Sequence, residues 1–98
     1  MSAVRSAAQW RAFWRERGML ELRALLGSAW PPLADATADA ADACAFRIAS
    51  LLGSRAPREA IADELARIRR DELGLDPRRD EDERAAGRIA AWFARAGA

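Results

Sequence analysis

The chain has 98 residues, of which 51% are hydrophobic and 32% are charged, and its formal net charge is +1. This length predicts one domain, and the near-neutral charge gives no general attraction to phosphate backbones or acidic membranes. The sequence contains no histidine, lysine or tyrosine and a single cysteine, Cys44, which excludes Ser–His–Asp and Cys–His nucleophile systems and a zinc site closed by histidine or cysteine. We therefore expect a protein that is not an enzyme and that needs no cofactor or metal ion.

The composition also bears on the compartment. No segment is long and apolar enough to span a bilayer, and several arginines interrupt the region where the hydrophobic part of a signal peptide would lie. One cysteine cannot form an internal disulfide. Arginine at every basic position fits a GC-rich bacterial genome better than selection for bidentate recognition. We expect a cytoplasmic bacterial protein in which Cys44 is a reduced, buried thiol.

Apolar residues recur at helical spacing along the chain, and the pattern calls for no strand. The chain is therefore predicted to be all-α, a single domain built as a small bundle of four or five helices. The expected helices span approximately residues 6–17, 19–30, 39–52, 57–73 and 77–96.

The first two helical segments have clear start and stop signals. Ser6 and Gln9 have the spacing of a capping box. Gly18 predicts a break or a kink, so the segments on either side form one bent helix or two helices. Pro31-Pro32 ends the second segment, because proline donates no backbone hydrogen bond. Residues 33–38 are expected to form a loop.

The helix over 39–52 can be capped in more than one way. Asp35, Thr37 and Asp39 all offer side-chain oxygens for its N-cap, and Gly53 is the expected C-terminal stop. Its predicted buried face consists of Cys44, Ile48, Leu51 and Leu52.

Proline and glycine also delimit the last two helices. Pro57 is expected in the first turn of the fourth, Gly74 and Leu75 predict a Schellman end in which Leu75 folds back, and Asp76-Pro77 should cap and start the fifth. The predicted buried residues are Ile61, Leu65 and Ile68 in the fourth helix, and Ala86, Ile89, Trp92, Phe93 and Ala96 in the fifth.

Two groups of carboxylates need an interpretation. The acidic run over 76–84 lacks the glycine and the terminal glutamate of a calcium loop, so it is read as a solvated first turn of a helix. Asp35, Asp39 and Asp42 could cap a helix, receive arginines from a partner or coordinate a hard cation. Capping is the favoured interpretation, and a carboxylate-only Mg²⁺ enzyme would require all three to converge.

Several arginines suggest an alternative, nucleic-acid-binding function. The segment 59–65 resembles the first helix of a helix-turn-helix motif, but the expected glycine turn near Leu65 is absent, so one continuous helix is predicted. The arginines that would contact nucleic acid are Arg67, Arg69, Arg70, Arg78 and Arg79.

The tryptophans carry the largest burial potential. Trp10 and Trp14 share a helical face with Phe13 at its edge, and they either complete the core or remain partly exposed as anchors for a partner or a second copy. Trp30 is expected to join the proline loop to the bundle. We predict that Trp14→Ala reduces any dimer more than Trp92→Ala, because Trp92 is assigned to the core.

Three segments of the chain resemble a family of short bacterial all-α proteins, domain of unknown function 1871. The first is Leu25–Leu33, which contains Trp30 before the prolines. The family pattern has an acidic residue where this chain has Pro31, and tyrosines where it has Ala41 and Cys44. The residues that match the other two segments are Asp39, Asp42, Arg47, Ile48, Leu51 and Leu52, followed by Ile61, Ala62, Leu65, Ile68, Leu73, Gly74 and Leu75.

The resemblance implies an all-α fold but no activity. Together with the missing catalytic residue types, it favours a non-enzymatic helical module that binds another protein, of the immunity or regulatory type. Trp10, Trp14, Asp35, Asp39 and Asp42 are the candidate contact residues.

Overall fold

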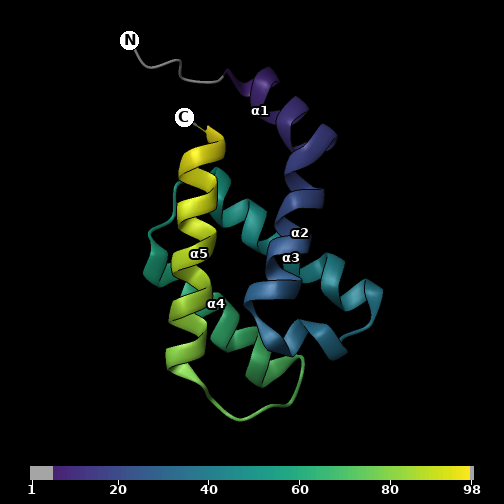
Figure 1. The fold of residues 1–98 in the computed structure, drawn as a ribbon, viewed down its shortest axis with the longest axis vertical. Coiled ribbons are helices and arrows are strands. Elements are labelled where there is room, and N and C mark those ends of the chain that lie inside the picture. The colour runs from purple at the N-terminus through teal and green to yellow at the C-terminus, as the bar shows by residue number, and fades with distance from the viewer. Residues whose placement is uncertain (1–5, 98) are drawn as a thin grey trace.

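The computed structural model describes residues 6–97, in which every regular element is helical and no strand occurs (Figure 1). The all-α prediction is therefore confirmed for this part of the chain. The elements are α1 (Ala7–Phe13), a π-helical turn (Trp14–Gly18), α2 (Met19–Ala29), a 3-10 helix (Pro31–Asp35), α3 (Ala38–Gly53), α4 (Arg58–Asp71) and α5 (Arg79–Gly97).

The first two helical segments form one continuous, irregular helix rather than two. The predicted capping box is present, because the Ser6 hydroxyl accepts from the Gln9 backbone N–H and the Gln9 side chain accepts from the Ser6 N–H. Gly18 has ordinary helical dihedral angles and does not break the helix. An added Cβ at Gly18 would lie 2.6 Å from Phe13 Cε2 and 2.7 Å from Trp14 Cε3. Glycine is required here so that two rings can pack against the backbone at the π-helical turn.

The segment between α2 and α3 is more regular than predicted. Trp30 is extended and ends α2, and the two prolines start a 3-10 helix where residues 33–38 were expected to form a loop. Thr37 caps α3, its Oγ1 accepting from the Ala40 N–H at 3.1 Å. The favoured interpretation of Asp35 and Asp39 as caps is therefore wrong. Asp39 lies instead in the first turn, where a negative charge suits the helix dipole.

After two of the helices, a residue adopts the left-handed backbone conformation. The α3 helix ends at Gly53, as predicted. The Arg55 and Ala56 N–H groups donate to the Leu52 and Leu51 carbonyls, respectively, in a Schellman arrangement whose left-handed residue is Arg55, with φ 59°. Gly74 is left-handed as predicted, with φ 63°.

The helices on either side of Gly74 are shorter than predicted. The α4 helix ends at Asp71 rather than 73, and α5 begins at Arg79 rather than 77. The Leu75 N–H donates to the Arg69 carbonyl, but the Leu75 side chain is 44% exposed and does not fold back into the core. The irregular segment 72–78 thus joins two antiparallel helices that pack along each other.

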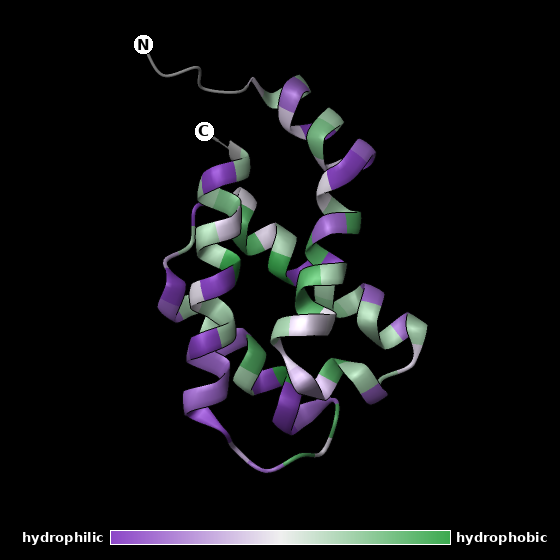
Figure 2. Cartoon of the chain, viewed as in Figure 1, coloured by the Kyte–Doolittle hydropathy of each residue, from purple (hydrophilic) through white to green (hydrophobic). Residues whose placement is uncertain are grey.

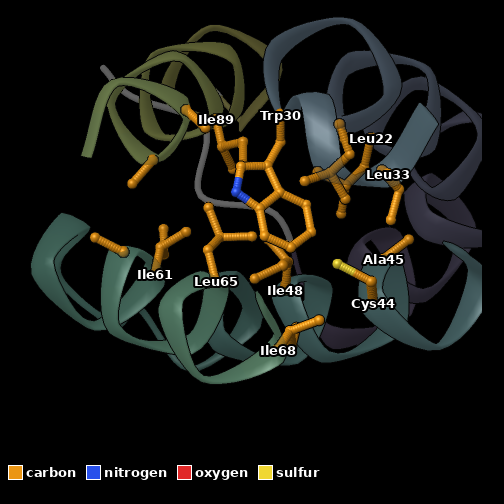
Figure 3. Packing of buried hydrophobic residues seen from close by; sticks show 14 of the residues in the cluster. Leu22, Trp30, Leu33, Cys44, Ala45, Ile48, Ile61, Leu65, Ile68 and Ile89 are labelled. Atoms are coloured by element: carbon orange, nitrogen blue, oxygen red, sulfur yellow. The ribbon is translucent and has the colours of Figure 1, made fainter. Parts of the chain in front are cut away.

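One hydrophobic cluster draws residues from α2, α3, α4 and α5 around Trp30, whose indole is completely buried (Figure 3). The predicted faces of α3 and α4 point into it, and apolar residues line the inner sides of the helices in Figure 2. Burial of a large apolar side chain stabilises the fold by about 2–3 kcal/mol. Within residues 6–97, no helix has the length and apolarity needed to cross a bilayer.

Candidate functional site

Five aromatic side chains meet where α1 and the π-helical turn approach the C-terminal end of α5. Trp10 and Trp14 both stack on Phe93, with ring centroids 5.1 and 5.8 Å apart. Phe13 contacts both tryptophans edge-on and also approaches Trp92. We call this set of five residues the aromatic cluster, and it joins the two ends of the chain at one end of the molecule.

Burial within the aromatic cluster differs from the prediction. Phe13, expected at the edge of the apolar face, is the buried member at 3% exposure. Trp10, Trp14, Trp92 and Phe93 are all half-buried. Trp92 and Phe93, both predicted to be buried, pack against the hydrophobic cluster but lie at its edge. The cluster closes around the Phe13 ring and leaves faces of four large side chains open to solvent.

A hydrogen bond from Trp92 fixes α5 to α2. Trp92 Nε1 donates to Glu21 Oε1 at 3.1 Å, and Glu21 also accepts from Arg17 Nε at 2.9 Å. These two bonds, with the Arg17 bond the stronger cause, hold the pKa of the Glu21 carboxyl below its usual value of 4.5. The position of the Trp92 ring is thus set by a polar contact as well as by packing.

Two adjoining hollows, with volumes of about 440 and 400 Å³, lie beside the aromatic cluster. Both are lined by Trp10, Leu52, Arg55 and Phe93, so they form one groove bounded by α1, the C-terminal end of α3 and α5. We call it the aromatic groove. The other residues that line it are Ala7, Arg11, Trp14 and Gly53 in one hollow, and Ala56, Ile61, Ala90 and Ala94 in the other.

The charges along the aromatic groove are all positive. Arg11 and Arg55 are exposed, and neither guanidinium forms an ion pair or hydrogen bond with another residue in the range 6–97. No aspartate or glutamate of that range lines either hollow. The groove is therefore apolar inside and cationic at its rim.

A third hollow, of about 500 Å³, lies between α2 and α3 and is lined in part by Leu20, which is 79% exposed. Asp42 borders it and pairs with Arg23 at 3.1 Å. Asp35 and Asp39 are exposed. Among the described residues, no three acidic, cysteine or histidine side chains are placed to hold a metal ion, so the three aspartates do not converge.

The arginines considered for nucleic-acid binding are all paired with acids. Arg69 is buried and is not available to a phosphate backbone. The exposed or half-exposed ones bond to neighbouring carboxylates: Arg67 to Glu64 and Glu72, Arg70 to Asp71, Arg78 to Asp80 and Glu81, and Arg79 to Asp63 and Glu83.

The buried polar centre of the molecule lies between α4, α5 and Trp30. Asp82, interpreted from sequence as a solvated first-turn residue, is only 1% exposed. Its Oδ1 accepts from Trp30 Nε1 at 2.8 Å and from Arg69 Nε and Nη2 at 3.1 and 2.7 Å, and Arg69 also reaches Glu81. Asp82 precedes Ala86, Ile89 and Phe93 by four, seven and eleven residues, so its place on the apolar stripe is the signal from which its burial could have been predicted.

Cys44 is buried in the hydrophobic cluster, as predicted. Burial, with a smaller contribution from the Glu64 charge, raises the pKa of its thiol to about 12. The thiolate is not formed at neutral pH, so Cys44 is a core residue and carries no nucleophilic chemistry.

Comparison of the chain with protein-family models, with curated proteins and with solved structures finds no match. The resemblance to domain of unknown function 1871 therefore stays a prediction.

Proposed function

We propose that this chain is a small helical bundle that binds another protein through its aromatic groove. The observation that carries the proposal is the pairing of half-buried Trp10 and Phe93, which together line both hollows of an open apolar groove. Aromatic side chains that bury further on binding contribute much of the free energy of protein association, particularly beside arginine. An immunity-type or regulatory partner protein fits such a role.

The proposal also accounts for the partial exposure of the aromatic cluster. Phe13 is its buried member, whereas Trp10, Trp14 and Phe93, which stack on one another across to α5, are only half-buried. Exposed aromatic surface costs free energy in water, and covering it by a partner recovers that cost.

Affinity capture from the native host tests the proposal. We expect a partner that is retained by the wild-type chain and lost with Trp10→Ala or Phe93→Ala. Phe46→Ala is the matched control, because Phe46 is also a large apolar residue, is 68% exposed, and lies on α3 away from the groove lining. A partner that the Trp10→Ala and Phe93→Ala chains retain as well as wild type does would contradict the assignment to this groove.

Two further measurements test whether the chain binds a second copy of itself or a nucleic acid instead. Analytical ultracentrifugation detects a homodimer, and the Trp14→Ala chain should then show less dimer than the wild type.

A mobility-shift titration at low ionic strength detects binding of nucleic acid, which should fall steeply as salt is added. A shift that depends on Arg67, Arg70, Arg78 and Arg79 would replace the proposal by the alternative function.

A further inference from the structure

We infer that the occupant of the aromatic groove is an acidic amphipathic helix of a partner protein, whose apolar side chains enter the two hollows and whose carboxylates pair with Arg11 and Arg55. The inference rests on the proposed function and adds the chemistry of the partner. It follows from the shape of the groove, the charge at its rim and the backbone conformation of Arg55.

The shape of the groove suits side chains presented by a helix. The two hollows adjoin and share four lining residues, so neighbouring side chains of one ligand can occupy both. An amphipathic helix displays apolar side chains three or four residues apart along one face. A ligand that binds by adding a strand to a sheet is excluded, because residues 6–97 contain no strand.

The positive charge at the rim of the groove favours a partner with negative charge. Most arginines near α4 are already neutralised by ion pairs, as with Arg67 and Glu64 or Arg79 and Asp63. Of the arginines in residues 6–97 that form no ion pair, Arg11 and Arg55 are the two that line the aromatic groove. The others are Arg15, Arg58, Arg88 and Arg95. Guanidinium groups at the edge of a desolvated contact pair favourably with carboxylates and disfavour cationic ligands.

Arg55 occupies a backbone position that glycine would fit better. Its φ of 59° lies in the left-handed region, and it is the left-handed residue of the Schellman end of α3, where glycine is the usual choice. Arg55 also lines both hollows. The requirement for a cation at the rim accounts for an arginine at this position, which local backbone preference does not.

Synthetic peptides test the inference directly. The probe is a fluorescein-labelled helix of about 18 residues with leucines on one face and glutamates flanking them. The control peptide has glutamine in place of each glutamate. Fluorescence anisotropy should show that the acidic peptide binds at least about tenfold more tightly, and that this difference shrinks as salt is added. Equal affinities for the two peptides, or no binding of the acidic one, would overturn the inference.

Arg55→Gly is the variant that separates binding from folding. We expect its melting temperature to equal or exceed that of the wild type, because glycine relieves the left-handed strain. We also expect it to bind the acidic peptide several-fold more weakly and the glutamine peptide unchanged. Undiminished binding of the acidic peptide by the combined Arg11→Gln and Arg55→Gly chain would refute the role of these two residues.

The failures of the two proposals are distinguishable. Suppose that a captured partner is lost with Trp10→Ala but retained by the chain that combines Arg11→Gln and Arg55→Gly. The aromatic groove then binds protein, and the inference that the partner is an acidic helix is wrong. If single-stranded DNA displaces the acidic peptide and binds more tightly, the rim serves nucleic acid, and the inference of a protein helix is overturned.

Discussion

Trp30 Nε1 donates a hydrogen bond to Asp82 Oδ1 over 2.8 Å, joining the end of α2 to the first turn of α5 across 52 positions in the sequence. The same oxygen receives two bonds from Arg69, and the Arg69 guanidinium lies 5.6 Å from the centre of the Trp30 ring. Asp82 Oδ2 is buried and accepts no hydrogen bond from the described residues. All three hydrogen bonds that the Asp82 side chain accepts from Trp30 and Arg69 therefore fall on one oxygen atom.

Removal of Asp82 should be strongly destabilising. In the Asp82→Ala chain the buried Arg69 loses the more deeply buried of its two counter-charges, and we expect the free energy of unfolding to fall by about 3–5 kcal/mol. The chain with both Asp82→Leu and Arg69→Met should recover much of this loss, because no charge is then left buried without a partner. Urea unfolding of the single and double variants measures both effects.

The exposed pair Arg79 and Asp63 is the matched control. Its side chains are 47% and 68% exposed, so Asp63→Ala should cost no more than about 1 kcal/mol. A loss of similar size for Asp63→Ala and Asp82→Ala would show that the buried network does not hold α4, α5 and Trp30 together.

Two glycines in the same irregular helix should respond oppositely to alanine. A Cβ at Gly27 meets nothing within 4 Å, so Gly27→Ala should stabilise the fold by about 0.5–1 kcal/mol through helix propensity. Gly18→Ala forces a Cβ against the Phe13 and Trp14 rings and should destabilise it by about 1–3 kcal/mol. Thermal unfolding followed by circular dichroism compares the two, and stabilisation by Gly18→Ala would be incompatible with the π-helical turn described here.

Acid should weaken the contact between α2 and α5. The pKa of Glu21 is lowered in the folded chain by its bonds from Arg17 and Trp92, so its contribution to stability is present above the usual pKa of 4.5 and is lost as the pH falls through the lowered value. The Glu21→Gln chain should lose less stability than the wild type over that range. The NMR signal of the Trp92 indole N–H, followed during acid titration, should shift in the wild type over the same range, and its failure to do so would argue against the bond.

Cys44 should be inert until the chain unfolds. Because burial raises the pKa of its thiol to about 12, the folded protein at pH near 8 should react with a disulfide reagent only at the rate of unfolding. Adding urea should bring the rate up to that of a free thiol. Rapid labelling of the folded chain would mean that Cys44 is accessible.

The positions of the helices were predictable from the sequence because helix signals are local. The capping box of Ser6 and Gln9 and the break at Pro31-Pro32 each involve only a few neighbouring residues. The left-handed Gly74 is a third local signal of this kind. The buried faces of α3 and α4 followed from a spacing of three or four residues, which any amphipathic helix needs.

Tertiary packing decided the features that matter for binding. Asp82 lies in an acidic first turn that the sequence predicts to be exposed to solvent. Only the approach of Trp30 and Arg69 buries its carboxylate and lets it accept their hydrogen bonds. The aromatic groove exists because α1 and α5, at opposite ends of the sequence, meet over the C-terminal end of α3. Contacts between residues so far apart depend on how whole helices cross, and a local pattern of residue types does not specify that crossing.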